Sequence, residues 1–278
     1  MIGVLNVTPD SFAEKMPVLV PGQPLDVAGA VGRAMAMEAA GADLIDVGGE
    51  STRPGAQPVT VDEELARVLP VIEAVCRAVR VPVSVDTYKP EVARRAVAAG
   101  AALINDISGL LYEPALAAVA AETGAALILM HTRGRSTAMY DEATYADLLG
   151  ELGDELERSL AVAAAAGVDR DRVIIDPGIG FAKRAEHSYG VLADFPALAA
   201  RLDRPLMIGP SRKSFMRAAT GDRPAEERDW GTAAAVTAAV LGGAHLIRLH
   251  AVPELVQVVN VAEEIRRAGL TGPPGAPR

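Results

Sequence analysis

Acceptor-bearing side chains follow three apolar runs of strand length in this sequence. Asp86 ends VSVD, Asn105 follows LI, and Asp176 ends VIID. Asp, Asn and Thr are favoured helix N-caps, and we interpret Thr87 and Asp106 in this way. Capping does not explain why the other three residues recur after such runs, whereas a site for a flat heterocycle does. Each oxygen can accept from the donor edge of such a ligand, since a polar group buried without a partner is costly.

Cationic side chains gather at comparable positions, although the formal net charge of the protein is -9. Arg53 lies in a loop punctuated by Gly and Pro, and Arg212 and Lys213 belong to GPSRKS, directly before a predicted helix. Arg248 and His250 leave LIRLH on the same side, because alternate residues of a strand share a face. Guanidinium groups bind phosphate oxygens in pairs, and helix N-termini favour anions. We therefore predict a site for a small anion and not a nucleic-acid surface, which needs basic density.

The stretch NVTPDSF at 6–12 has two interpretations. Thr, Pro and Asp are common turn formers, so the motif is compatible with an ordinary turn. The amide oxygen of Asn6, beside the carboxylate of Asp10, also suits Mg²⁺, which binds through few protein ligands and the phosphates of its substrate. His131, at the end of LILMH, is likewise open to a structural or a functional interpretation.

Strand-like and helix-like segments alternate about eight times along the chain, and the strand-like segments lead to the polar residues above. Continuous β-branched runs indicate strands buried on both faces, as in a parallel sheet covered by helices. Helical patterns fill the intervals, and many of them end in Gly before the next strand. The clearest span 26–41, 61–79, 90–100 and 147–167.

The distribution of polar residues favours a closed barrel over an open sheet. An open doubly wound sheet concentrates its site at one switch point, but here polar residues follow nearly every strand and no G-x-G-x-x-G motif follows the first. We therefore predict an α/β protein with a single (β/α)8 TIM barrel over residues 1–270. The active site is expected at the C-terminal ends of the strands, and 271–278 is expected to be a disordered tail.

The composition agrees with one barrel domain. With 278 residues, 50% of them hydrophobic, the chain can form the large core that a TIM barrel needs. Cys76 is the single cysteine and has no disulfide partner in the chain, so we expect a cytoplasmic location. Met1 runs directly into a strand without the basic lead of a signal peptide, and no apolar run reaches the length of a membrane span. Small molecules, not membranes or nucleic acids, are the expected partners.

Taken in order, the motifs resemble those of the dihydropteroate synthase family of pterin-binding enzymes. The resemblance extends from Asn6 to the helix after His250. It is carried by NVTPDSF, DVGGESTRPGA, SVDTYKPEV, INDISG, LMH, DPGIGF-x-K, GPSRKS and R-x-H. One such motif is weak evidence, but eight in the family's order, each at the end of a predicted strand, are highly specific.

The resemblance implies a (β/α)8 barrel, usually dimeric, that acts in folate synthesis. It joins p-aminobenzoate to 6-hydroxymethyl-7,8-dihydropterin diphosphate and releases pyrophosphate and 7,8-dihydropteroate. By this resemblance the catalytic residues are Asp86, Asp176, Lys213, Arg248 and His250. The substrate-binding residues are Asp10, Phe12, Thr52, Arg53, Pro54, Asn105, Ile107, Met130, Phe181, Arg212 and Ser214, and Asn6 meets Mg²⁺.

The implied roles divide the site into three parts. The pterin is held by Asp86, Asn105, Asp176 and Lys213, between apolar walls formed by Ile107, Met130 and Phe181. The diphosphate is held by Arg53, Arg248 and His250, and the p-aminobenzoate site is bounded by Phe12, Thr52, Pro54 and Ser214. Cations and Mg²⁺ beside a leaving diphosphate favour dissociative substitution, with no covalent enzyme intermediate.

Residues 13–25 depart from the family's pattern. The family usually continues NVTPDSF with Ser-Asp-Gly-Gly, whereas this chain has AEKM at 13–16, without the glycine hinge, followed by PVLVPG. Two alternatives stay open. One is a non-catalytic pterin-binding paralogue whose altered lid excludes p-aminobenzoate, and the other is a pterin binder of the folate-dependent methyltransferase class. Arg53, Arg212 and Arg248 favour a diphosphate ligand and argue against the second alternative.

Overall fold

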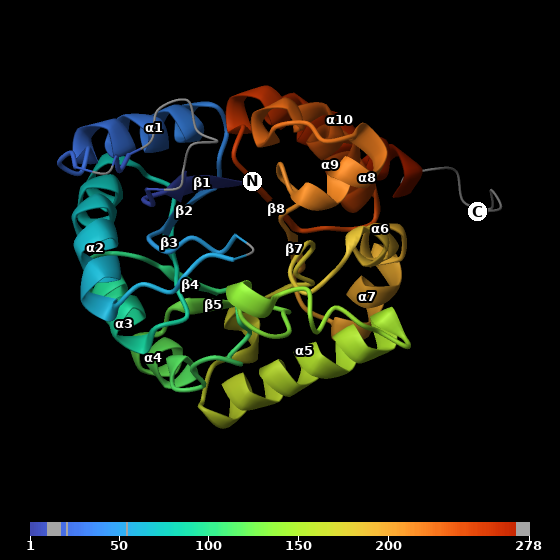
Figure 1. Ribbon diagram of the computed structural model, residues 1–278, viewed down its shortest axis with the longest axis horizontal. Coiled ribbons are helices and arrows are strands. Elements are labelled where there is room, and N and C mark those ends of the chain that lie inside the picture. Colours follow the sequence, from blue (N-terminus) through green and yellow to red (C-terminus); the bar gives the residue numbers. More distant parts are fainter. Residues whose placement is uncertain (10–17, 21, 54, 271–278) are drawn as a thin grey trace.

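The computed structural model describes residues 1–9, 18–20, 22–53 and 55–270. Within these ranges the chain forms eight parallel strands around a central axis, encircled by helices (Figure 1). The strands are β1 (Ile2–Asn6), β2 (Leu44–Gly48), β3 (Val83–Asp86), β4 (Leu103–Asp106), β5 (Ala126–Met130), β6 (Val173–Asp176), β7 (Met207–Ile208) and β8 (Leu246–Leu249). Their order is β6-β5-β4-β3-β2-β1-β8-β7, and a bridge from Ile175 to Leu206 joins β6 to the segment before β7. The predicted (β/α)8 barrel is confirmed.

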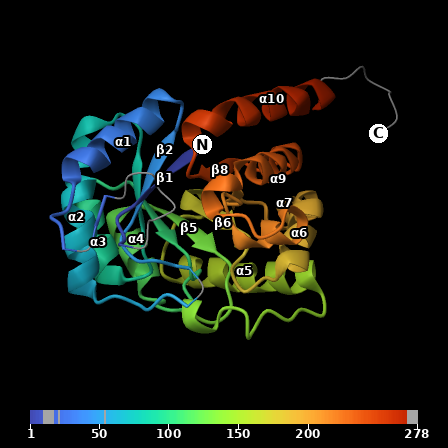
Figure 2. The same cartoon turned by 45° about the horizontal axis from the view of Figure 1, so that its top comes forward.

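The helices form the outer layer of the barrel (Figures 1 and 2). They are α1 (Val27–Ala39), α2 (Val61–Ala78), α3 (Pro90–Ala98), α4 (Leu116–Thr123), α5 (Leu148–Ala165), α6 (Ala185–Ala193), α7 (Phe195–Leu202), α8 (Arg217–Thr220), α9 (Asp229–Leu241) and α10 (Val252–Leu270). Short 3-10 turns are η1 (Ser136–Ala138), η2 (Arg170–Arg172), η3 (Ser214–Met216) and η4 (Ala225–Glu227). Side-chain caps mark several starts, as where Thr60 Oγ1 accepts a hydrogen bond from Glu63 N at 3.2 Å.

Each strand alternates between outward side chains, which pack against the helices, and inward ones. Val85 and Leu127 face the outer core and are fully buried. The floor of the barrel interior is an apolar cluster of Ile2, Leu44, Leu103, Ile128 and Met207. Toward the C-terminal strand ends, the same inward phase carries polar side chains instead. The strand register places Asp86 beside Gly48 on one side and Asn105 on the other, so strand pairing itself brings predicted site residues together.

Two predicted segments lie wholly or partly outside the described residues. The tail at 271–278 lies entirely outside them, and so do 13–17 and 21 of the segment 13–25. Helix α10 continues to Leu270, the last residue described. In the described part of the chain, no helix is both long and apolar enough to cross a membrane.

Candidate active site

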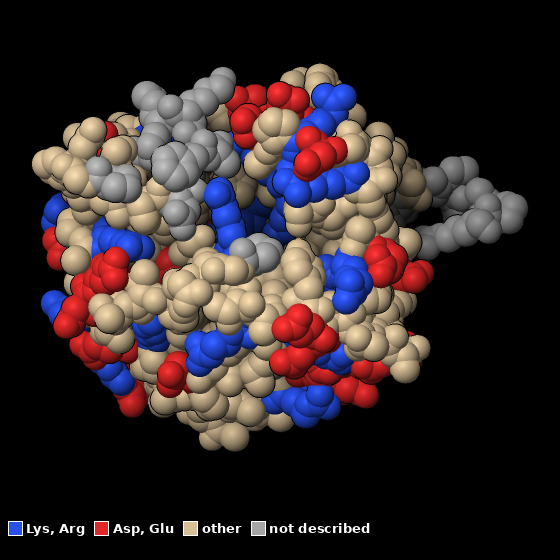
Figure 3. Space-filling view, viewed as in Figure 1, with Lys and Arg blue, Asp and Glu red and all other residues tan. Residues whose placement is uncertain are grey.

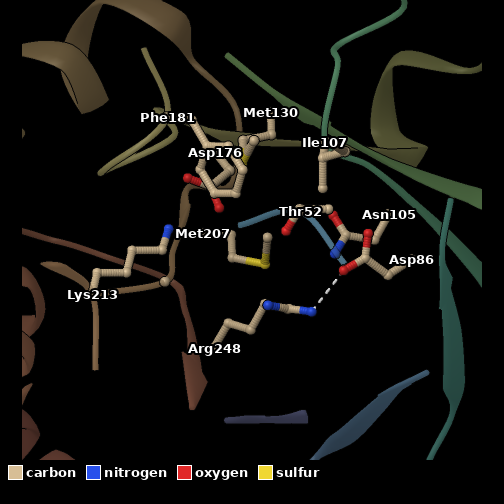
Figure 4. Close-up of a pocket in the computed structure, with 11 residues that line it drawn as sticks. Thr52, Asp86, Asn105, Ile107, Met130, Asp176, Phe181, Met207, Lys213 and Arg248 are labelled. Carbon is tan, nitrogen blue, oxygen red and sulfur yellow. Dashed lines mark hydrogen bonds and ion pairs between the residues drawn. The ribbon is translucent and has the colours of Figure 1, made fainter. Parts of the chain in front are cut away.

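A pocket lies at the mouth of the barrel, between the strand ends and the loops that follow them (Figure 4). It is lined by Thr52, Asp86, Asn105, Ile107, Met130, Asp176, Phe181, Met207, Gly209, Lys213 and Arg248. Apart from Met207 and Gly209, each of these is an expected site residue. Met207 belongs to the apolar floor of the barrel. The structure therefore brings nine of the expected site residues together in one cavity.

Asn105 and Asp176 present oxygen acceptors in this pocket. Asn105 is 2% exposed, and its Nδ2 donates to Asp46 Oδ2 at 2.9 Å. Its Oδ1 is buried and has no hydrogen-bond partner among the described residues. Asp176 Oδ1 accepts a hydrogen bond from Gly178 N at 2.7 Å, and burial raises the pKa of Asp176. A buried acceptor that lacks a partner within the protein is suited to a donor on a ligand.

Arg248 lies between two carboxylates at one side of the pocket. Its Nε donates to Asp46 Oδ2 at 2.7 Å and its Nη2 to Asp86 Oδ2 at 2.8 Å, the second contact being the dashed line in Figure 4. Burial raises the pKa of Asp86, although the Arg248 charge acts in the opposite direction. Asp46 begins the DVGGESTRPGA motif but is not among the expected site residues. Its position on the inward phase of LIDVG is the signal that marks it.

Apolar walls and a cation form the other side of the pocket. Ile107 and Met130 are buried in one cluster, against which Phe181 packs. Lys213 Nζ donates to Ile179 O at 2.6 Å and lies 4.6 Å from the centre of the Phe181 ring. Burial lowers the pKa of Lys213 to about 8. Figure 4 shows Lys213 and Phe181 across the pocket from Asp86 and Asn105, an arrangement that suits a flat ring with polar edges.

His250 follows β8 and is held by Ser211. His250 N donates to Ser211 Oγ at 3.1 Å, and His250 Nδ1 lies 3.0 Å from the same oxygen. The Ser211 hydroxyl can donate to Nδ1 while it accepts from the backbone, and in that tautomer the imidazole carries its proton on Nε2. Burial, followed by the charges of Arg248, Arg212, Arg53 and Lys213, lowers the pKa of His250 to about 3. His250 is thus a neutral donor in a cationic field, which suits an anion.

Arg53 and Arg212 take different places at the mouth. Arg53 lies exposed in the loop after β2. Figure 3 shows Lys and Arg side chains around the central hollow of this face. Arg212 has a φ of 59° and forms an ion pair with Asp229, while Arg228 Nη1 donates to its carbonyl oxygen at 2.9 Å. Arg212 does not belong to the described residues that line the pocket, so its contact with a substrate stays a prediction.

The remaining expected site residues lie around the rim or outside the described residues. Asn6 ends β1 and is half-buried, and it shares the inward phase of Ile2 and Val4. Ser214 begins η3, and its Oγ lies 3.5 Å from the hydroxyl oxygen of Tyr140. Asp10, Phe12 and Pro54 are outside the described residues. The described part of the chain contains no group of three or more His, Cys, Asp or Glu side chains placed to hold a metal ion.

Three side chains, Lys183, His131 and Glu155, form a largely buried hydrogen-bonded network next to the loop that carries Phe181. Lys183, which is 1% exposed, has its Nζ 2.8 Å from His131 Nδ1, and His131 Nε2 lies 2.8 Å from Glu155 Oε2. When Lys183 is an ammonium it can only donate to Nδ1, and the imidazole is then neutral with its proton on Nε2, facing Glu155. Burial lowers the pKa of His131 to about 4 and that of Lys183 to about 7. His131 therefore has the structural role, and no local pattern marks Glu155 as its partner.

The fold and the pocket together define a (β/α)8-barrel enzyme with a site for a flat polar ring and a neighbouring anion. The chain belongs to the pterin-binding enzyme family, whose model matches residues 2–250, and within it to the dihydropteroate synthases. The dihydropteroate synthase of Synechocystis sp. is 42% identical over 267 residues, which cover 96% of this chain and 90% of that protein.

Two solved structures extend the comparison to three dimensions. A Yersinia pestis dihydropteroate synthase with a sulfonamide drug complex has a TM-score of 0.89 and 39% sequence identity, covering 96% of this chain and 94% of its own. A Xanthomonas albilineans dihydropteroate synthase with 4-aminobenzoic acid has a TM-score of 0.86 and 40% identity, covering 95% and 92%. The family membership indicated by the sequence motifs is confirmed.

Proposed function

We propose that this protein condenses p-aminobenzoate with 6-hydroxymethyl-7,8-dihydropterin diphosphate, giving 7,8-dihydropteroate and pyrophosphate. The observation that carries the proposal is the buried Asn105 Oδ1, which has no hydrogen-bond partner in the described part of the chain and lies in a pocket that also holds Lys213 and Arg248. The acceptor suits the donor edge of a pterin, and the cations suit the diphosphate on its methylene group.

The pterin ring fits the half of the pocket lined by Asn105 and Asp176. Its N–H groups would donate to Asn105 Oδ1 and to the Asp176 carboxylate, and its acceptor atoms would face the Lys213 ammonium. Phe181 would cover one face of the ring. Met130 would form the apolar wall near the ring. Each polar edge atom thereby replaces water with a protein partner, which is the condition for binding a polar ring in a buried site.

The chemistry needs stabilisation of opposite charges at the two ends of one breaking bond. When the bond between the pterin methylene carbon and the diphosphate oxygen breaks, its electron pair stays on the diphosphate. Arg248, Arg53 and the Nε2 proton of His250 would bind that charge. The Asp86 and Asp176 carboxylates would favour the positive charge left on the pterin. The lone pair of the p-aminobenzoate nitrogen then attacks the carbon, and its proton passes to water, so no covalent enzyme intermediate forms.

Magnesium is proposed as the cofactor, with Asn6 as a protein ligand. The carboxamide of Asn6 offers a hard oxygen on the inward side of β1, at the mouth where the diphosphate would lie. Mg²⁺ usually keeps several waters and binds through one or two protein groups plus substrate phosphates, so a single such oxygen fits its needs. When bound, the ion would neutralise charge on the diphosphate oxygens.

The p-aminobenzoate site is proposed to lie toward the rim, between Thr52 and Ser214. Thr52 lines the pocket, and Ser214 begins the turn that follows Lys213. Phe12 and Pro54 complete the proposed set. The binding of 4-aminobenzoic acid by the Xanthomonas albilineans synthase supports this second substrate.

The assembly and the compartment are also proposals. A homodimer is supported by apolar side chains on the outside of α9 and α10, where Leu241, Val261 and Ile265 are exposed. A second copy would remove that surface from water. A cytoplasmic location is supported by Cys76, which is free and half-buried. Sedimentation of the purified protein and fractionation of its host cells test the two statements separately.

Calorimetry and product analysis test the proposed reaction. We expect the pterin diphosphate to bind alone in the presence of Mg²⁺, and added p-aminobenzoate to release one pyrophosphate for each dihydropteroate formed. A pterin lacking the diphosphate serves as the control, since it can bind but cannot react. If p-aminobenzoate neither binds nor yields pyrophosphate, the protein is a pterin binder and the proposal fails.

A further inference from the structure

Asp46 is a buried carboxylate beside the pocket and does not belong to its lining. It lies on β2, is 1% exposed, and faces the barrel interior. Three donors converge on it. Ser84 Oγ donates to Oδ1 at 2.5 Å, and Asn105 Nδ2 and Arg248 Nε donate to Oδ2 at 2.9 and 2.7 Å. Through these contacts one side chain connects β2 with β3, β4 and β8.

The contact with Asp46 decides which end of the Asn105 amide faces the pocket. If the amide were reversed, its oxygen would lie 2.9 Å from Asp46 Oδ2, and two acceptors would be in contact. The NH₂ group must therefore face Asp46, and Oδ1 is left without a partner among the described residues, beside the ligand space. Without Asp46 the amide can rotate and present a donor to a ligand that offers a donor.

The same carboxylate oxygen also holds Arg248. The Nε contact with Asp46 and the Nη2 contact with Asp86 engage two nitrogens of one guanidinium, so its plane is determined by both carboxylates. Planar guanidinium groups bind phosphate through paired N–H groups, and the plane decides where the remaining N–H groups point. Asp46 thus determines the direction of one cation as well as that of one acceptor.

We infer that Asp46 is a positioning residue for both halves of the substrate. It orients the Asn105 carbonyl toward the pterin and the Arg248 guanidinium toward the diphosphate, without touching either. The identity of the two ligands rests on the proposed function. The geometric part does not, since it concerns contacts within the protein.

A double-mutant cycle tests the inference by calorimetry, with a pterin and with inorganic pyrophosphate as separate probes. We expect Asp46→Ala to weaken pterin binding by about 10- to 100-fold, the usual result of an unmatched buried hydrogen-bonding group. In the Asn105→Ala background, the same substitution should weaken pterin binding less than about threefold, because its path to the pterin is gone. Asp46→Ala should weaken pyrophosphate binding in both backgrounds, because Arg248 loses the contact that orients its guanidinium. Equal loss of pterin affinity in both backgrounds would overturn the inference.

Ser84→Ala is the matched control for simple loss of structure. Ser84 is fully buried and donates to Asp46, but it contacts neither Asn105 nor Arg248 in the described contacts. We expect it to lower the thermal midpoint and to leave both affinities within about threefold of wild type. If Ser84→Ala reproduces the affinity losses of Asp46→Ala, Asp46 is only a structural residue. A wild type that binds no pterin at all would instead contradict the proposed function.

Isosteric substitutions cover the case in which Asp46→Ala does not fold. In Asn105→Asp two carboxylates share one hydrogen bond, so one proton must lie between them, and pterin affinity should fall as the pH rises. Adding Asp46→Asn restores one donor and one acceptor between these two positions, with loss of the Arg248 Nε contact to the same atom, and should remove this pH dependence. If pterin affinity depends on pH in the same way in wild type, in the single variant and in the double variant, the inference is contradicted.

Discussion

Arg212 and Asp229 form a bidentate ion pair, with Nε to Oδ1 at 2.8 Å and Nη2 to Oδ2 at 2.7 Å. The pair connects the loop after β7 to the first turn of α9. Arg212 has a left-handed backbone conformation, one residue before Lys213. The guanidinium of Arg212 is therefore bound within the protein. Its ion pair with Asp229 stabilises the loop that carries Lys213 and Ser214.

Breaking this pair is expected to lower stability and to loosen the loop. Arg212→Lys and Asp229→Asn should each reduce the free energy of unfolding by about 1–2 kcal/mol, because a two-point contact to a charged group is lost. Both should raise KM for p-aminobenzoate by similar factors. Arg217→Gln, which removes the exposed pair with Asp222, is the control and should cost less than about 0.5 kcal/mol. If Asp229→Asn leaves KM unchanged while Arg212→Lys raises it, Arg212 binds the substrate directly.

The pKa of Lys213 predicts an alkaline limit to substrate capture. Burial lowers that pKa to about 8, so the ammonium is charged below this pH and neutral above it. We expect kcat/KM for the pterin diphosphate to fall as the pH rises through about 8, since this ratio reports on the free enzyme. Lys213→Arg, which stays charged, should move the decline to higher pH even if its plateau is lower. A decline at the same pH in both proteins would assign it to another group.

The buried His131 predicts a pH-dependent term in stability. Its pKa is lowered to about 4, below its ordinary value of 6.5, so its contribution is complete above pH 6.5 and is lost as the pH falls toward 4. His131→Gln lacks this term. Between pH 6 and 4, the slope of unfolding free energy against pH should therefore be shallower in the variant, by up to about 1.4 kcal/mol per pH unit. Denaturant unfolding across this range measures it, and equal slopes would refute the assignment.

Arg248 and Asp176 are expected to serve different halves of one substrate. Arg248→Ala should weaken pyrophosphate binding by about 10- to 100-fold and should weaken pterin binding less. The reason is that the lost guanidinium forms its charged hydrogen bonds with the anion and not with the pterin ring. Asp176→Asn should show the reverse preference. Titrations with the two probes separate the effects, and thermal unfolding checks that each variant is folded. Equal loss of both ligands in both variants would indicate that the pocket has collapsed.

The proposed Mg²⁺ contact of Asn6 gives a metal-dependent prediction. Chelation of Mg²⁺ should weaken binding of the pterin diphosphate but leave binding of a pterin without phosphates unchanged. Asn6→Ala should raise the Mg²⁺ concentration needed for half-maximal activity, and Asn6→Asp should restore it, since a carboxylate is also a hard oxygen ligand. Asn260→Ala, on α10 far along the chain, is the control. A Mg²⁺ requirement that is the same in all three variants would remove Asn6 from the metal site.

The architecture and much of the pocket could be predicted from the sequence because both depend on local patterns. Alternating apolar runs and helical segments determine a parallel barrel, and in such a barrel all C-terminal strand ends meet at one mouth. Asp86, Asn105 and Asp176 end or follow their runs on the inward phase, so strand register alone places them in one cavity.

The pairing of the charged groups depends on the three-dimensional packing of the chain. Arg212 and Arg248 look alike in the sequence, as cations near strand ends, yet the first contacts Asp229 and the second contacts Asp46 and Asp86. The buried contact of Lys183 with His131 has no sequence signal either. Long cationic side chains reach several partners, and the choice depends on backbone conformation and on which carboxylates other strands and helices bring within hydrogen-bond distance. The sequence indicates where the chemistry lies, and the packing of strands and helices determines which groups are available to perform it.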